Sequence, residues 1–76
     1  MKEVLRTIAE NIVDNPQEVS VKEREEGQSI ILELRVADED MGKVIGKGGR
    51  VAKAIRTLIE AAATKAKKQV RVEIKD

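Results

Sequence analysis

The sequence predicts a small α+β fold in the order αββααβ, with a three-stranded sheet and helices packed on one of its faces. Two patterns support this class. Apolar residues recur every three or four positions near the N-terminus and again after residue 50, as in amphipathic helices. In the middle of the chain and near its C-terminal end they alternate with polar residues, as in half-buried strands. We expect residues 1–76 to form a single domain, because 76 residues can build only one small core.

The first half is expected to contain a helix and a hairpin. The helix extends over residues 2–13 and ends before Asn15-Pro16, since proline disfavours helix in the residue that precedes it. Strands are expected over Val19–Arg24 and Ser29–Val36, and the polar turn at 25–28 joins them into an antiparallel pair. The inward row expected on the second strand consists of Ile30, Leu32, Leu34 and Val36.

The second half is expected to contain a short helix, a break, a long helix and a strand. Asp38 is expected to cap a helix that reaches Ile45, and the glycines at 46–49 interrupt it. The long helix covers Arg50–Lys67 and the strand covers Gln69–Lys75. Because two helices connect this strand to the preceding one, the two strands are expected to be parallel neighbours. The apolar row expected on the long helix consists of Val51, Ala54, Ile55, Leu58, Ile59, Ala62 and Ala66. Val70, Val72 and Ile74 are expected to face inward from the last strand, and the nine residues predicted for the core are these three, the inward row of the second strand, Ile55 and Ile59.

Five residue types are absent from the chain, namely Cys, His, Phe, Tyr and Trp. Without Cys or His, the usual zinc ligands and catalytic bases are missing, so we expect no metal, no cofactor and no enzymatic activity. The lack of Cys favours a cytoplasmic location, and no apolar stretch approaches the length of a membrane span. Modules that stack bases on aromatic rings are disfavoured for the same compositional reason.

Charge is distributed unevenly along the chain, although the net charge is only +1. Residues 1–42 contain five basic and eleven acidic residues, whereas residues 43–71 contain nine basic residues and one acidic residue. Such asymmetry suggests a polyanionic partner. The alternative is a solvated basic helix whose charges pair with the acidic half of the same chain.

The Gly-Lys-Gly-Gly segment at 46–49 places three glycines in four positions between two expected helices. Two interpretations are open: a tight turn without a ligand, or a loop that another molecule approaches closely. Lys47 lies at the tip between Lys43 and Arg50, and these cations with the N–H groups of the next helix suit a phosphate. A Walker A loop is excluded because Gly48 stands where that motif needs Ser or Thr. A dinucleotide fingerprint is excluded because the loop follows a helix.

The stretch Asp40-Met41-Gly42-Lys43-Val44-Ile45-Gly46-Lys47-Gly48-Gly49-Arg50 resembles the KH signature, a Val-Ile-Gly-x-x-Gly core between two helices. The order αββααβ is similar to the type II, prokaryotic form of this domain. Because the module would occupy the whole chain, the sequence resembles the small bacterial single-KH proteins of the KhpA (YlqC) family. One position departs from the KH pattern: Ala52 stands where Ile or Leu is usual.

This resemblance implies a non-enzymatic protein that binds single-stranded RNA and acts as an RNA chaperone or post-transcriptional regulator. A KH loop clamps the backbone of about four nucleotides. Phosphates would follow the loop at 46–49, and bases would turn toward an apolar floor and the backbone near 70–72. The expected RNA-binding residues are Gly42, Lys43, Val44, Ile45, Gly46, Lys47, Gly48, Gly49, Arg50 and Lys53. The resemblance also implies a homodimer, or a heterodimer with a larger KH-containing protein.

Several alternatives stay open at this point. At least one of Val44 and Ile45 is expected to belong to the core, with Ile45 favoured as mainly a core residue. Lys53 and Arg56 are also explained as the solvated face of a helix. A KH fold that serves only as a protein-interaction adaptor is the competing function. Self-association is further suggested by the three alanines at 61–63 and by Ile31, which faces away from the expected core row.

Overall fold

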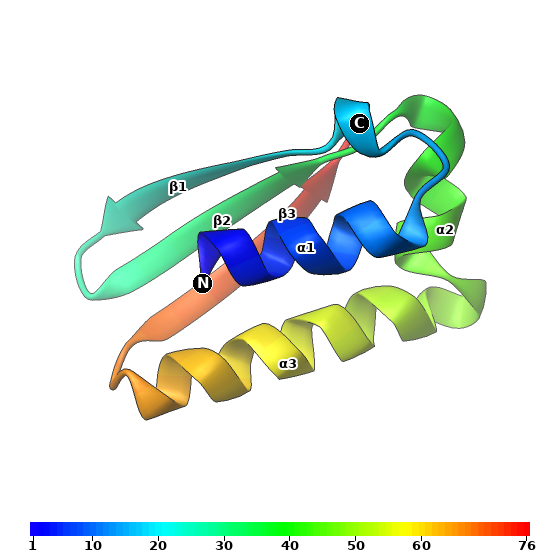
Figure 1. The fold of residues 1–76 in the computed structure, drawn as a ribbon. Coiled ribbons are helices and arrows are strands. Elements are labelled where there is room, and N and C mark those ends of the chain that lie inside the picture. Colours follow the sequence, from blue (N-terminus) through cyan, green and yellow to red (C-terminus); the bar gives the residue numbers. More distant parts are fainter.

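The computed structural model describes residues 1–76 and confirms the predicted α+β order (Figure 1). Short 3₁₀ turns precede β1, α2 and α3. Figure 1 shows α1 and α3 side by side over one face of the sheet, with α2 at one end of the molecule. The elements are α1 (Lys2–Ile12), β1 (Ser20–Glu26), β2 (Ser29–Arg35), α2 (Met41–Ile45), α3 (Arg50–Lys65) and β3 (Gln69–Lys75).

The three strands form one sheet in the order β1-β2-β3. β1 pairs antiparallel with β2, so that Val21 lies opposite Leu34. β2 pairs parallel with β3, and Leu32 lies opposite Val72. The predicted hairpin and the predicted parallel pair are both confirmed. Because β2 is central, its inward side chains are the most deeply buried, and Leu32 and Leu34 have no exposed surface.

The hydrophobic core lies between the sheet and the helices α1 and α3. α1 contributes Leu5 and Ala9, and α3 contributes Ile55 and Ile59, all at most 2% exposed. Seven of the nine residues predicted for the core are buried in it, and Val70 and Ile74 pack against it while partly exposed. The seven are Ile30, Leu32, Leu34, Val36, Ile55, Ile59 and Val72.

The buried stripe of α3 is narrower than predicted. Ala52 and Ala63 are buried together with Ile55 and Ile59, at spacings of three and four, whereas Leu58 is 58% exposed. The predicted row also included Ala54 and Ala66, which are exposed. The small side chains at both ends of the buried stripe let the helix approach the sheet closely. Ala52 therefore occupies the core position at which the KH pattern usually has a larger residue.

The prediction that Asp38 caps the short helix is wrong. Asp38 begins a 3₁₀ turn over Asp38–Asp40, and α2 starts at Met41 without a side-chain cap. The extended conformation of Ala37 places Asp38 inside this turn instead of at a helix entry. The carboxylate with a structural task is that of Asp40, which is 1% exposed and bonds to the segment after α1.

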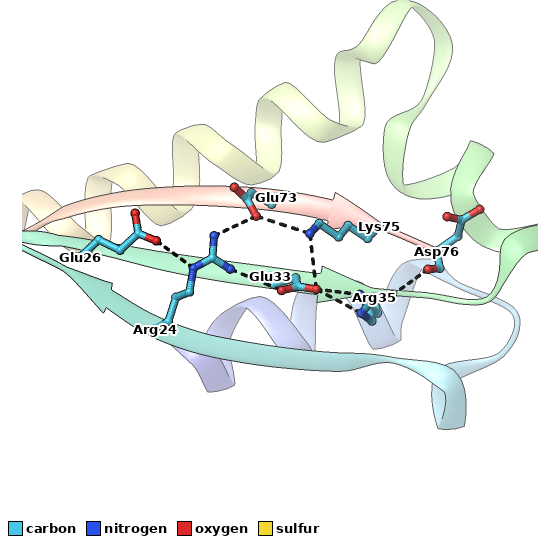
Figure 2. Close-up of polar contacts among 7 residues, drawn as sticks. All are labelled: Arg24, Glu26, Glu33, Arg35, Glu73, Lys75 and Asp76. Carbon is cyan, nitrogen blue, oxygen red and sulfur yellow. Dashed lines mark hydrogen bonds and ion pairs between the residues drawn. The ribbon is translucent and has the colours of Figure 1, made fainter.

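The outer face of the sheet carries a network of ion pairs (Figure 2). Arg24 lies within 3.5 Å of carboxylates on all three strands, and Arg35 and Lys75 also approach Glu33. Ile31 lies on this face but is only 3% exposed. Its neighbours in the register are Arg24 and Arg71, whose long aliphatic stems can cover an apolar residue. Ile31 therefore offers almost no exposed apolar surface, so it does not support self-association as the sequence suggested.

Candidate nucleic-acid interface

The glycine loop joins α2 to α3 through three residues in left-handed conformations. Gly46 has φ 76° and ψ 170°, Gly48 has φ 63°, and Gly49 has φ 78°. Two short hydrogen bonds fix the loop: the N–H of Gly46 donates to the carbonyl of Gly42 at 2.9 Å, and the N–H of Gly49 to that of Gly46 at 3.0 Å. Residues with a Cβ atom disfavour such φ values, so the backbone conformation alone accounts for glycine at all three positions.

The space around the glycines separates their roles. A Cβ on Gly46 would lie 2.4 Å from Cγ2 of Val51, so this glycine is needed for packing of the loop against α3. A Cβ on Gly48 or Gly49 would meet no atom within 4 Å, so the outer side of the loop is open. Gly42 is different again, because it is helical and also has open space beside it. Neither its backbone conformation nor its packing requires a glycine.

The cations around the loop are Lys43, Lys47, Arg50 and Lys53, and all four are exposed. Of the nine basic residues in 43–71, only Lys43 makes an ion pair, with its Nζ 2.6 Å from Oδ2 of Asp14. The other basic residues that pair with the acidic half are Arg24, Arg35 and Lys75, which belong to the strands. The interpretation in which the basic segment is neutralised by its own chain is therefore wrong for eight of its nine members.

The expected apolar floor is smaller than predicted. Val44 is completely buried and belongs to the core, so it can offer no surface to a ligand. Ile45, on the other side of the same short helix, is 38% exposed. α2 has a core side and an outer side because successive residues of a helix are rotated by about 100° around its axis, so Val44 faces the core and its neighbour Ile45 does not. The outer side carries Gly42 and Ile45, next to the glycine loop.

β3 is an edge strand, and its free backbone groups lie close to α3. The carbonyl of Lys75 points toward β2, because it accepts a hydrogen bond from the N–H of Val36. The backbone groups of successive strand residues point in opposite directions, so those of Val70, Val72 and Ile74 point outward, away from β2. Nε of Arg56 donates to the carbonyl of Val72 at 3.4 Å and thus bridges α3 and this edge. No sequence pattern indicates this contact, because it depends on how a helix lies against a sheet edge.

The pKa values of Lys43 and Asp40 are both shifted by residues distant in sequence. The hydrogen bond from Lys43 to the Asp14 carboxylate raises the pKa of Lys43. Burial favours a higher pKa for Asp40, but hydrogen bonds from the Asn15 side chain and from the N–H groups of Asp14 and Asn15 outweigh it and lower the pKa. Sequence reasoning missed Asp14 and Asn15, which lie 25 to 29 residues before their partners.

The largest hollow on the surface, about 580 Å³, lies away from the glycine loop. It is formed by the hairpin turn and the C-terminal end of α3, and its lining includes Gly27, Lys67 and Lys68. Figure 1 shows these segments at the end of the molecule opposite α2. The glycine loop lies outside this hollow, with a basic rim on one side and the edge of β3 beyond α3.

A glycine loop between two helices, a hairpin before them and a parallel edge strand after them define a type II KH domain. The family model described as "KhpA/KhpB, KH domain" matches residues 2–74, and the chain belongs to this family. The resemblance noted in the sequence is thereby confirmed. No helix of the structure has the length and apolar character needed to cross a membrane.

Curated relatives match the chain over almost its whole length. A protein of Clostridium acetobutylicum named "RNA-binding protein KhpA" is 66% identical over 74 residues, which are 97% of this chain and 99% of that protein. Proteins of the same name from Caldanaerobacter subterraneus and Halalkalibacterium halodurans are 64% identical over 74 residues and 51% identical over 76 residues. They cover 97% and 100% of this chain, and 99% and 100% of their own lengths.

Part of the Era chain has the same fold in solved structures. Era from Aquifex aeolicus matches with a TM-score of 0.67 and 20% identity, over 97% of this chain and 29% of that chain. A second structure, of Era in complex with a nucleotide and a segment of 16S ribosomal RNA, matches with a TM-score of 0.61 and 21% identity, over 97% and 28% of the two chains. At this identity the likeness concerns the fold alone.

Proposed function

We propose that this protein is a non-enzymatic binder of single-stranded RNA that uses the glycine loop and the adjacent groove. The observation that carries the proposal is the set of eight cations in 43–71 without an internal ion pair, of which Lys47, Arg50 and Lys53 flank the loop with open glycines. Relatives that are 46–66% identical are named as RNA-binding proteins. We assign the whole of residues 1–76 to this one module.

The proposed contact with RNA begins at the phosphates. The backbone passes along residues 46–49, where the missing side chains of Gly48 and Gly49 leave room for a phosphate close to the main chain. The N–H of Arg50 already donates to the carbonyl of Lys47, and the next N–H groups at the start of α3 have no acceptor within the helix and suit an anion. Lys47, Arg50 and Lys53 add charge at the rim. These contacts position the strand without reading its sequence.

The bases are proposed to lie between the outer side of α2 and the edge of β3. Gly42 leaves space above the helix, and Ile45 supplies exposed apolar surface. The outward backbone groups of Val70 and the N–H of Val72 can pair with base edges, as a neighbouring strand would, whereas the Val72 carbonyl already accepts a hydrogen bond from Nε of Arg56. No aromatic ring is needed for this arrangement, in agreement with a composition that has none.

The role in the cell that fits such a module is that of a cytoplasmic RNA chaperone or post-transcriptional regulator. One groove that holds about four nucleotides binds weakly, and a second linked groove raises the affinity through effective concentration. We therefore also propose self-association through α3, where Leu58 is 58% exposed. Sedimentation that reports a dimer for the wild type and a monomer for Leu58→Asp would support it. If only a larger KH-containing chain is bound at this surface, the pairing is heterologous.

The function is tested by replacing both open glycines with aspartate. In Gly48→Asp/Gly49→Asp, the new side chains block the phosphate and their charges repel it, so binding of a fluorescein-labelled random-sequence RNA is expected to be lost. Both positions have positive φ, which costs about 1–2 kcal/mol per residue for ordinary side chains and less for Asp or Asn. The double asparagine variant is the matched control, because it has the same shape and backbone preference without the charge.

Thermal melting of each variant separates a lost site from a lost fold. The proposal expects a folded double aspartate variant that binds no RNA, and a double asparagine variant that retains part of the affinity. Unchanged RNA affinity in a folded double aspartate variant contradicts it, and the protein-interaction adaptor then becomes the better interpretation.

A further inference from the structure

One cation beside the glycine loop, Lys43, already forms an ion pair with a carboxylate of the same chain. Nζ of Lys43 lies 2.6 Å from Oδ2 of Asp14, whereas Lys47, Arg50 and Lys53 make no ion pair. Both partners are accessible, with 45% of the Lys43 side chain and 70% of the Asp14 side chain exposed. The pair is therefore within reach of a ligand that lies on α2, and it is not sealed in the core.

The position of Asp14 is fixed by its backbone. The N–H of Asp14 donates to Oδ1 of Asp40 at 3.1 Å, and the N–H and Nδ2 of Asn15 both donate to Oδ2 of Asp40 at 3.0 Å. Asp40 is 1% exposed and directly precedes α2, the helix that carries Lys43. The segment after α1 is thus tied to the start of α2, and the Asp14 carboxylate is held over Lys43.

We propose that Asp14 competes with an RNA phosphate for Lys43 and thereby lowers the affinity of the glycine-loop site. The inference rests on the proposed RNA-binding function. Asp14 acts through Lys43 and does not itself contact RNA, so it is a positioning and affinity-setting residue. A strand that uses Lys43 has to replace the carboxylate first, which keeps the complex easier to dissociate.

The expected size of the effect follows from the strength of an exposed ion pair. Such pairs contribute about 0.2–1 kcal/mol, which corresponds to about a 1.4- to fivefold change in affinity. Freeing Lys43 also adds one phosphate contact that releases counterions, so the slope of log affinity against log salt becomes steeper by about 0.7 for a single strand.

The test is an RNA titration of Asp14→Asn at several salt concentrations, with the labelled random-sequence RNA as the probe. Asparagine keeps the shape of the side chain and leaves the backbone bond to Asp40 in place. The expected results are about 1.4- to fivefold tighter binding at low salt and the steeper salt slope. Both gains are expected to vanish in Asp14→Asn/Lys43→Gln, which should bind like Lys43→Gln alone.

Glu25→Gln is the matched control, because it removes one exposed carboxylate that lines the hollow between the hairpin turn and the C-terminal end of α3, away from the glycine loop. Charges further apart than about 10 Å are largely screened at 0.1 M salt, so this variant should bind RNA like the wild type. An equal gain in Glu25→Gln would show a general charge effect and overturn the proposal.

Two further outcomes separate this inference from the proposed function. If the wild type binds RNA, the double aspartate loop variant does not, and Asp14→Asn melts earlier without tighter binding, then the pair is only structural and the inference fails alone. If the wild type binds no RNA, both fail. Should Asp14→Asn not fold, Lys43→Gln and Lys47→Gln are compared in the wild-type background: the proposal expects the smaller loss for Lys43→Gln, and equal losses overturn it.

Discussion

A Cβ on Gly46 would lie 2.4 Å from Cγ2 of Val51 and 2.9 Å from its backbone nitrogen. The end of α2 and the first turn of α3 are therefore in contact through a position that only hydrogen can occupy. Gly46 also has φ 76° and ψ 170°, a combination that side chains strongly disfavour. The first glycine of the loop sets the angle between the two helices, and the later two leave its outer side open.

Replacement of Gly46 by alanine is expected to destabilise the fold more than replacement of Gly48. Gly46→Ala combines an overpacked contact with a strained backbone, and a loss of about 2–4 kcal/mol in the free energy of unfolding is expected. Gly48→Ala meets no neighbour and carries only the left-handed strain, about 1–2 kcal/mol. Urea unfolding of both variants measures the difference, and equal losses would contradict the role assigned to Val51.

Gly42→Ala is expected to change stability and RNA binding in opposite directions. Gly42 is helical with open space at its Cβ position, so alanine should raise the free energy of unfolding by up to about 1 kcal/mol. The added methyl group would stand where the bases are proposed to lie, and RNA affinity should fall. Thr7→Ala on the exposed side of α1 is the control: it should also stabilise the fold, with unchanged binding. Stronger RNA binding by Gly42→Ala would show that Gly42 does not belong to the RNA-binding site.

The sequence was sufficient for the features that depend on local periodicity. Alternation in β2 gave the correct inward row, including Leu32, because one face of a strand is decided by every second residue. The glycine loop was found because three glycines between helical patterns have few explanations. The predicted buried face of α3 was only partly right. Leu58 and Ile59 are adjacent and both apolar, and the sequence alone did not show which of them the sheet covers.

Features that depend on the approach of distant segments could not be predicted. No burial of Asp40 was expected from the sequence, yet it is buried because the backbone of Asp14 and Asn15 comes to it from 25 or 26 residues away. Ile31 was expected to be a free apolar surface, but it lies among the charged side chains of neighbouring strands. Arg56 and the edge of β3 meet for the same kind of reason. Each needs the tertiary arrangement before the contact can be inferred.

Leu32→Ala tests the register of the central strand. Leu32 has no exposed surface and lies opposite Val72, so truncation leaves a cavity in the middle of the core. A loss of about 2–5 kcal/mol in the free energy of unfolding is expected, measured by chemical denaturation. A loss under about 1 kcal/mol would indicate that the strand register is wrong. Glu33→Ala, on the opposite face, serves as the comparison and should cost less.

Asp40 is expected to contribute to the pH dependence of stability. Its pKa is lowered in the folded state below the ordinary value of 3.8, so its contribution is present at neutral pH. The contribution is lost as the pH falls from about 4 through the lowered folded-state pKa, where protonation weakens the bonds to Asp14 and Asn15. Asp40→Asn should have a lower urea midpoint at pH 7 and a smaller further drop toward pH 3. An acid response equal to that of the wild type would assign the loss to other carboxylates.

Lys47→Ala tests whether the tip of the loop binds phosphate. Lys47 lies between two glycines, is exposed and makes no ion pair, so its removal should leave the melting temperature unchanged. RNA affinity should fall by a similar factor for every sequence tested, because phosphate contacts carry no base information. The salt slope should become shallower by about 0.7, the share of one phosphate contact in a single strand. Lys65→Ala, at the opposite end of α3, removes the same charge and is the matched control. If both variants lose affinity and salt slope equally, RNA is attracted by the general charge of the basic segment, and the loop holds no phosphate.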